Sequence, residues 1–241
     1  MKYAIIAAGE GSRLAKEGVS VPKPLVSVQG EPLVDRLIRI FSDHQASEIA
    51  VICNELMPDV VCHLKRRRDE GKIVVPLRVV VKSTPSSMHS LYELSPFLDD
   101  EVFCAATVDT VFREQDFAGY VKALQRMCID GDADGLMAVT AHIDDEKPLY
   151  VSVGADEWID GFHDAHVQGA DLVSAGIYGL TRRSLPVLRQ CVQRGESRMR
   201  NFQRALLDEG LRLRAYPFGK VLDIDHAEDI TKAEAFLQEG V

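Results

Sequence analysis

The sequence has few cysteines, and none of them are spaced for a metal site or a redox motif. No Cys-x-x-Cys occurs, and the number of cysteines is odd: Cys53, Cys62, Cys104, Cys128 and Cys191. This scatter argues against a disulfide framework and against a zinc ribbon, and it indicates free thiols in a reducing compartment. We therefore expect a cytoplasmic protein.

Long apolar runs and an excess of basic residues are also missing. No apolar stretch approaches the roughly 20 residues that span a membrane, and Met1–Ile6 begins a strand rather than a signal peptide. The 37 acidic and 28 basic residues give a formal net charge of −9, which argues against a general nucleic-acid-binding protein. We expect neither a membrane nor a nucleic acid as a partner.

Apolar runs alternate with helical patterns along all 241 residues, and no linker or repeat divides them. Fully apolar strands separated by amphipathic helices predict a mostly parallel sheet that is covered on both faces. Closely spaced strands in the second half predict an antiparallel insertion. The expected strands are Tyr3–Ala7, Glu48–Cys53, Leu77–Val81, Val102–Val108, Leu136–Ala141, Leu149–Val153, Trp158–His163, Leu172–Leu180, Leu211–Tyr216 and Val221–Ile224; the expected helices are Leu33–Phe41, Asp59–Glu70, Gln115–Met127, Ser184–Gln193, Met199–Glu209 and Ala227–Gln238.

A glycine-rich loop directly follows the first expected strand. It reads Ala7-Ala8-Gly9-Glu10-Gly11-Ser12-Arg13-Leu14, and Pro22-Lys23-Pro24-Leu25 follows at a distance that one loop can cover. Glycines let backbone N–H groups approach a phosphate closely, and Arg13 and Lys23 supply two cations that grip its charge. The third glycine of a dinucleotide fingerprint is replaced by Leu14, and no P-loop pattern surrounds Gly219-Lys220. The loop therefore predicts a polyphosphate site of another kind.

Three segments in order along the chain carry a family resemblance. The glycine loop with Pro-Lys-Pro-Leu and Val28–Leu33, then Val108–Phe112, then Leu222–Ile230 resemble the signatures of sugar-phosphate nucleotidyltransferases, the nucleotide-sugar pyrophosphorylases. The resemblance implies a single three-layer α/β/α domain over residues 1–241, with a mostly parallel, Rossmann-like mixed sheet of the nucleotide-diphospho-sugar transferase type. Residues 1–112 would form the nucleotide-binding half, and residues 113–241 the acceptor-binding half with the closing metal motif.

The resemblance implies that an oxygen of a phosphorylated acceptor attacks the α-phosphorus of an NTP and that pyrophosphate leaves. Such chemistry needs positioning and charge neutralisation rather than a general base. Arg13 is the candidate transition-state cation, and Lys23, held between two prolines, is the second catalytic residue. Ala7, Ala8, Gly9, Gly11 and Ser12 are the candidate nucleotide-binding residues of the loop.

Three aspartates are candidate ligands for Mg²⁺, the cofactor that the resemblance implies. Asp109 follows a central strand, at the sheet edge where α/β proteins bind ligands. Asp223 and Asp225 lie two positions apart, which on a strand places them on one side, and either could be the second carboxylate. Helix capping by Asp225 or His226 is compatible with this role.

Two further segments resemble the substrate-reading parts of the family. Ser83–Leu91, with Ser86 and Ser90, resembles the base-recognition loop of choline-phosphate and related cytidylyltransferases; its hydroxyls read a base edge or cap the following helix. Ser174–Tyr178 resembles the acceptor-side segment and makes Gly176 and Tyr178 candidate acceptor-binding residues, with a plain buried strand as the alternative. The usual acceptor-binding lysine is missing near Trp158–His163, where His163 and His166 are the basic residues.

We therefore expect a cytoplasmic, Mg²⁺-dependent nucleotidyltransferase that acts on an NTP and a phosphorylated small molecule, with a sugar 1-phosphate as the first choice of acceptor. The alternatives are a cytidylyltransferase acting on phosphocholine or a phosphonate, and a non-catalytic nucleotide-binding regulatory protein of the same fold. The sequence permits a monomer or a homodimer.

Overall fold

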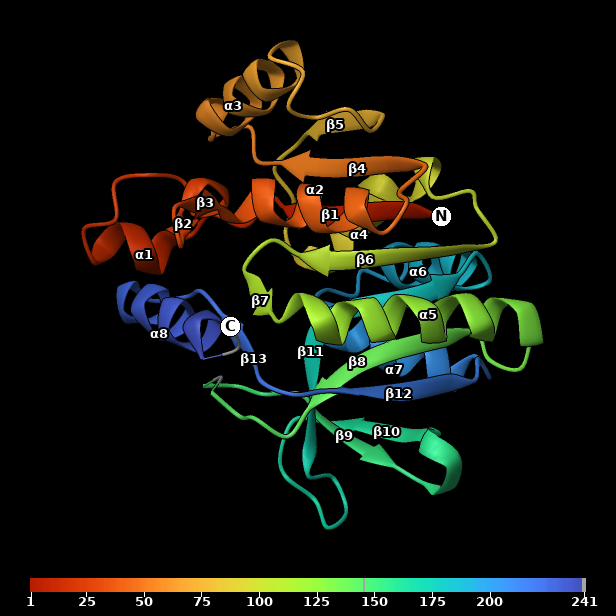
Figure 1. Cartoon of the computed structure of the whole chain (residues 1–241). Coiled ribbons are helices and arrows are strands. Elements are labelled where there is room, and N and C mark those ends of the chain that lie inside the picture. The colour runs from red at the N-terminus through yellow and green to blue at the C-terminus, as the bar shows by residue number, and fades with distance from the viewer. Residues whose placement is uncertain (145, 240–241) are drawn as a thin grey trace.

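A computed structural model describes residues 1–144 and 146–239 of the chain, and a mixed sheet runs through its centre (Figure 1). The strands in chain order are β1 (Lys2–Ala7), β2 (Ser27–Val28), β3 (Glu31–Pro32), β4 (Glu48–Cys53), β5 (Leu77–Val81), β6 (Val102–Thr107), β7 (Thr110–Phe112), β8 (Gly135–Thr140), β9 (Tyr150–Val153), β10 (Ile159–His163), β11 (Leu172–Thr181), β12 (Leu213–Phe218) and β13 (Val221–Asp223).

Helices follow most of these strands. They are α1 (Ser12–Lys16), α2 (Leu33–Asp43), α3 (Pro58–Asp69), α4 (Ser87–Leu94), α5 (Glu114–Asp130), α6 (Ser184–Gln193), α7 (Met199–Asp208) and α8 (Ala227–Gln238), with short 3-10 turns η1 (Lys23–Leu25), η2 (Ser95–Phe97) and η3 (Ala155–Glu157). Within the described residues, no helix is long and apolar enough to cross a membrane.

The large sheet joins parallel and antiparallel parts. Strands β5, β4, β1 and β6 are parallel neighbours in that order, and β12 is parallel to β8. Strand β11 is antiparallel to β6, β8 and β9, and β9 is antiparallel to β10, so β11 links the two parallel parts to the β9–β10 hairpin. The predicted α/β fold with a mostly parallel mixed sheet and an antiparallel insertion is thus confirmed.

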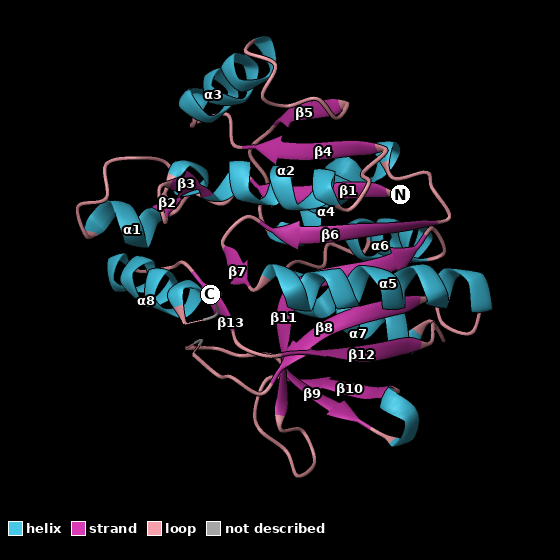
Figure 2. Cartoon of the chain, in the orientation of Figure 1, coloured by secondary structure: helices cyan, strands magenta, loops and turns pink. Residues whose placement is uncertain are grey.

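The sheet is covered on both faces because its strands alternate between two cores. In β1, Tyr3 and Ile5 belong to the core that contains α2 and α5, whereas Ala4 and Ile6 belong to the core that contains α4, α6 and α7. This alternation is the period of two that a strand imposes on its side chains. Figure 2 shows α2 and α5 on the near face of the sheet and α4, α6 and α7 behind it.

The carboxyl ends of the parallel strands determine where chemistry can take place. In Figure 1 the arrowheads of β4 and β6 point to the side where α1, β7 and α8 lie. Strand β13 pairs with β7 so that Asp223 lies opposite Thr110. This small sheet brings residues 221–223 back to the end of β6, and open α/β sheets bind their ligands at the carboxyl ends of such strands.

Candidate functional site

The glycine loop runs from the end of β1 into α1 and is shaped by its two glycines in different ways. Gly11 has a φ of +60°, and a Cβ added there would lie 2.9 Å from the Cβ of Lys23. Only glycine fits such a left-handed residue packed against a neighbour at that distance. Nothing lies within 4 Å of a Cβ added at Gly9, so at this position the backbone faces open space.

Lys23 lies on the turn η1 and binds two carboxylates. Its side chain is 9% exposed; Nζ donates to Asp109 Oδ2 at 2.5 Å and to Asp225 Oδ1 at 2.7 Å. Burial alone would lower the pKa of the ammonium, but the negative charges of Asp109 and Asp225 outweigh it and raise that pKa above its ordinary value. Lys23 is therefore a fixed positive charge throughout the neutral pH range.

The pairing of β7 with β13 explains why these carboxylates converge. Asp109 follows β6 and precedes β7, and Asp225 follows β13. The backbone N–H of Ile224 donates to the carbonyl oxygen of Asp109 at 3.1 Å, which locks the two segments together. The backbone pairing thus fixes the segments that carry Asp109 and Asp225 next to each other.

Asp223 lies beside this pair but has a different environment. Thr110 Oγ1 donates to Asp223 Oδ1 at 3.1 Å. The residue is exposed to a cleft, and desolvation followed by the negative charge of Asp109 raises the pKa of the Asp223 carboxyl. Asp225, by contrast, shares the ammonium of Lys23 with Asp109.

Arg13 projects from α1 between two acids. Its Nη1 atom donates to Asp225 Oδ2 at 3.0 Å, and Nη2 lies 3.5 Å from Glu146 Oε2. One turn along, Glu17 accepts from the backbone N–H of Ala227 at 2.7 Å and pairs with the His226 ring at 2.6 Å. This contact fastens α1 to the start of α8.

A cavity of about 430 Å³ opens above the glycine loop. The glycine loop and the segment before α4 line it, together with Lys23 and Asp109. Its lining residues are Ile6, Ala8, Gly9, Glu10, Gly11, Ser12, Arg13, Lys23, Thr84, Pro85, Ser86, Ser87, Ser90, Thr107, Val108, Asp109 and Asp225. We call it the nucleotide cavity.

A second cavity of about 550 Å³ lies between β8, β11 and α8. We call it the acceptor cleft. Its lining includes Thr140, His142, Ser174, Ala175, Asp223 and residues of α8. Arg13 and Asp225 line both cavities, so the two spaces meet at this ion pair.

The segment before α4 presents hydroxyl groups to the nucleotide cavity. Ser90 is 2% exposed and pairs with Thr84 Oγ1 at 2.6 Å. Ser86 stands at the N-terminus of α4, but its hydroxyl makes no capping hydrogen bond there; it accepts from the backbone N–H of Arg198 at 3.1 Å and pairs with His89 at 2.9 Å. Of the two interpretations from sequence, helix capping by Ser86 is therefore wrong.

Most of the predicted site residues come together, but some do not. Ala8, Gly9, Gly11, Ser12, Arg13, Lys23, Ser86, Ser90, Asp109, Asp223 and Asp225 line one or both cavities. Ala7 is 1% exposed in β1 and is absent from both linings, so its predicted contact with a nucleotide is corrected to a core role.

Gly176 and Tyr178 also lie outside both linings. Gly176 has a φ of +72°, and a Cβ there would meet the hydroxyl of Thr110 at 2.5 Å. It makes room for the Thr107–Thr110 pair rather than for a ligand. Tyr178 is 6% exposed in the core. The buried-strand interpretation fits Tyr178, whereas Gly176 is half-buried. Ser174 and Ala175 line the acceptor cleft instead.

The two histidines considered for the acceptor lie apart from the acceptor cleft. His163 pairs with Ser152 at 3.0 Å within the β9–β10 hairpin, and His166 pairs with Asp171 at 3.1 Å. Sequence reasoning missed Lys232 of α8 and Glu146 of the loop before β9, both of which line the cleft. Neither residue has a local motif, so the sequence offered no signal for them.

The donor atoms near Lys23 are suited to a hard divalent cation. One carboxylate oxygen of Asp109 and one of Asp225 contact the same ammonium group, that of Lys23. A second cation could bind between the same two carboxylates. In the described part of the chain, no three His, Cys, Asp or Glu side chains are grouped to hold a metal ion on their own. Mg²⁺ fits such a place because it takes one or two protein carboxylates and completes its shell with phosphate oxygens and water.

Comparison with known proteins adds an independent observation. The model of the MobA-like NTP transferase domain family matches residues 3–209. A glucose-1-phosphate cytidylyltransferase of Salmonella typhimurium is 28% identical over 123 residues, 43% of this chain and 48% of that protein. A 2-aminoethylphosphonate cytidylyltransferase of Lancefieldella rimae is 29% identical over 90 residues, 37% of this chain and 36% of that protein. This chain therefore spans half or less of the length of these relatives.

A solved structure shows the same fold over the whole chain. The inositol-1-phosphate CTP transferase from T. maritima superposes with a TM-score of 0.80 at 18% sequence identity, covering 100% of this chain and 97% of that one. At this identity the likeness concerns the fold alone.

Proposed function

The chain belongs to the family of MobA-like NTP transferase domains, and from that premise we propose that it transfers a nucleotidyl group from an NTP to the phosphate or phosphonate of a small molecule, with release of pyrophosphate. The observation that carries the proposal is the meeting of the two cavities at Arg13 and Asp225. One cavity can hold a triphosphate against the glycine loop, and the other can hold an acceptor whose oxygen points at the α-phosphorus.

The reaction forms one P–O bond and breaks another. A phosphate or phosphonate oxygen of the acceptor, ionised at neutral pH, attacks the α-phosphorus, and the bond from that phosphorus to the bridging oxygen breaks. Negative charge grows on the oxygens around the α-phosphorus and on the departing pyrophosphate, so fixed cations provide the catalysis. In this site the groups that can stabilise the growing negative charge are the backbone amides of the glycine loop, the Lys23 ammonium and the Arg13 guanidinium.

We propose Asp109 and Asp225 as the ligands of Mg²⁺, with Asp223 behind them. The support is that both carboxylates meet at Lys23, while Asp223 is bound to Thr110 and has a raised pKa. When bound, the ion would neutralise phosphate charge and align the triphosphate. Lys23 and Arg13 would then turn from the aspartates towards phosphate oxygens.

The partial matches to two cytidylyltransferases support CTP as the first donor to test. For the acceptor, those relatives point to a sugar 1-phosphate or an aminoalkyl phosphonate. A non-catalytic nucleotide-binding protein is the weaker alternative, because a protein without turnover has no need to keep Arg13, Lys23 and Asp109 converged on one point.

Replacement of Arg13 tests this proposal. Its ion pairs are half-exposed (the Arg13 side chain is 48% exposed), so Arg13→Ala should change the free energy of unfolding by less than about 1 kcal/mol. The loss of a transition-state cation should lower kcat by about 10²–10³-fold. The measurement is pyrophosphate release with each of the four NTPs, Mg²⁺ and a panel of phosphorylated acceptors.

Arg126→Ala is the matched control, because Arg126 is 83% exposed on α5 and pairs with an acid as Arg13 does. It should keep the activity of the unmodified protein. A well-folded Arg13→Ala protein with full turnover would contradict the assignment of Arg13.

A further inference from the structure

The acceptor cleft carries far more negative than positive charge, and this balance constrains what it binds if the proposed function holds. Seven carboxylates line the cleft, whereas Arg13 and Lys232 are the permanent cations among the described lining residues. Two of the carboxylates, Asp223 and Asp225, belong to the proposed metal site. Five remain on the acceptor side, an unfavourable setting for a phosphate that brings only more negative charge.

Three of these five already have partners. Glu17 is bound to His226 and to the N-terminus of α8. Asp229 accepts from the backbone N–H of His226 at 2.7 Å. Lys232 lies 2.8 Å from Glu228 and 3.1 Å from Asp229. These groups hold α8 in place and leave little capacity for a ligand.

Asp144 and Glu146 are in a different position. Asp144 lies 3.9 Å from Lys232, which is already engaged by the closer acids of α8. Glu146 lies 3.5 Å from Nη2 of Arg13 and 3.8 Å from the His226 ring, which is itself held by Glu17. When Arg13 turns to substrate phosphates, Glu146 loses its closest cation. A cation on the substrate can replace it.

The spacing indicates how far that cation lies from the acceptor phosphorus. The guanidinium of Arg13 contacts Asp225 on one side, at 3.0 Å, and Glu146 on the other, at 3.5 Å. Glu146 is therefore one guanidinium group away from the point where the two cavities meet. A short alkyl chain between phosphorus and nitrogen, with bonds of about 1.5 Å, has a length of this order.

We infer that the acceptor carries a primary ammonium group a short chain away from its phosphate or phosphonate, and that Glu146, assisted by Asp144, selects it. The ammonium gives three N–H donors to carboxylates whose own cations are distant or shared with other acids. The phosphate end lies at Arg13 and Lys23, and the amine end lies at the acidic rim. A sugar 1-phosphate, whose sugar part is uncharged, would leave that rim without a counter-charge.

The lining also distinguishes a primary amine from a quaternary ammonium. Proteins recognise a trimethylammonium group mainly through the faces of aromatic rings. Among the cleft-lining residues that the structure describes there is no Phe, Tyr or Trp. Carboxylates without aromatic rings favour a group that donates hydrogen bonds, so phosphocholine is expected to be the poorer substrate.

Four acceptors that differ at one end test the inference. Pyrophosphate release is measured with the preferred NTP and Mg²⁺ for 2-aminoethyl phosphate, 2-hydroxyethyl phosphate, phosphocholine and glucose 1-phosphate. The 2-hydroxyethyl compound has the same length as the amine but no charge. Because hydrogen bonds between charged groups are stronger than those to a neutral hydroxyl, we expect kcat/KM to be about 10- to 100-fold higher for the amine than for the hydroxyl compound.

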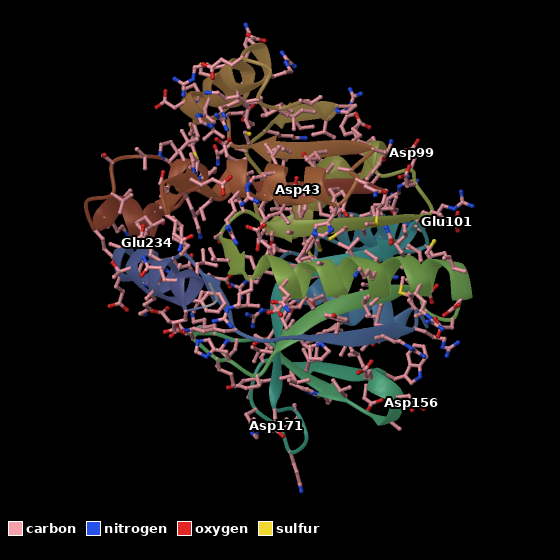
Figure 3. The ribbon with its side chains drawn as sticks, viewed as in Figure 1. Asp43, Asp99, Glu101, Asp156, Asp171 and Glu234 are labelled. Atoms are coloured by element: carbon pink, nitrogen blue, oxygen red, sulfur yellow. The ribbon has the colours of Figure 1, made fainter. Side chains whose placement is uncertain are left out.

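Glu146→Gln keeps the shape of the side chain and removes its charge. It should reduce the preference for the amine at least 10-fold, by raising KM for the amine while kcat and the turnover of the hydroxyl compound stay near their original values. Glu146→Asp should restore part of the preference. The control is Asp156→Asn, which removes one charge from the exposed turn η3; Figure 3 shows Asp156 at the opposite side of the molecule from α8.

The outcomes separate this inference from the proposed function. Equal or better turnover of the hydroxyl compound or of glucose 1-phosphate overturns the inference and leaves the proposed function intact. An unchanged preference in Glu146→Gln overturns the role of Glu146. Absence of pyrophosphate release with every NTP and acceptor overturns the proposed function, and the inference with it.

Discussion

Replacement of Lys23 by methionine probes the centre of the site directly. The substitution keeps the length of the side chain and removes the ammonium that holds Asp109 and Asp225 together. Two carboxylates are then left facing each other with no cation between them. The protein must push them apart, protonate one of them or recruit another cation.

The size of the effect follows from the exposure of the three groups. Breaking a buried ion pair from one side costs about 3–5 kcal/mol. Because the Asp109 side chain is 23% exposed and that of Asp225 is 41% exposed, water offsets part of this cost, and we expect a loss of about 1.5–3 kcal/mol. In a chain of 241 residues this corresponds to a decrease in Tm of about 4–10 °C.

The assay is thermal unfolding with and without Mg²⁺. A divalent cation between Asp109 and Asp225 would replace the missing ammonium, so Mg²⁺ should raise the Tm of Lys23→Met more than that of the unmodified protein. Lys122→Met, on the exposed face of α5, is the control and should change neither Tm nor its response to Mg²⁺. A Lys23→Met protein that melts within about 1 °C of the original in EDTA, or gains no more from Mg²⁺ than the control, would refute this reasoning.

The remaining predictions concern the glycine loop and the contact between α1 and α8. Gly11→Ala should lose about 1–2 kcal/mol of stability, because a left-handed alanine is strained and its Cβ meets Lys23. Gly9→Ala should have the Tm of the unmodified protein but bind NTP more weakly in calorimetry. Equal Tm values for the two variants would contradict the loop geometry. The hydrogen bond that the His226 ring donates to Glu17 raises the pKa of His226 above 6.5. The stability that this pair adds is therefore present below pH 6.5 and is lost as the pH rises through the folded-state pKa. An NMR titration should place the His226 midpoint above 6.5 and closer to 6.5 in Glu17→Gln; identical midpoints would exclude the pairing.

The sequence predicted the frame of the molecule because periodicity and helix signals are local. The bounds of β4 (Glu48–Cys53), β5 (Leu77–Val81), α6 and α8 agree with the predicted ones. The short helix α1 and the strand β7 were not predicted. Each has few residues and no period of its own, and β7 exists because β13 returns to pair with it.

The phosphate end of the site was predictable because its residues stand in two dense motifs. The acceptor end was not, because Glu146 and Lys232 come from distant segments of the chain and have no motif around them. Gly176 misled the prediction. A glycine in a strand can make room for a ligand or for a neighbouring side chain, and only the position of Thr110 decides between them.

The fate of the α-phosphate tests the central claim most directly. CTP, or whichever NTP proves to be the donor, is labelled in separate samples at the α- or the γ-phosphorus and incubated with Mg²⁺ and an acceptor such as 2-aminoethyl phosphate. We predict that the α-label enters the product and that the γ-label leaves as pyrophosphate in equal amount. Transfer of the γ-label to the acceptor, or release of orthophosphate without a labelled product, would contradict nucleotidyl transfer at the junction of the two cavities.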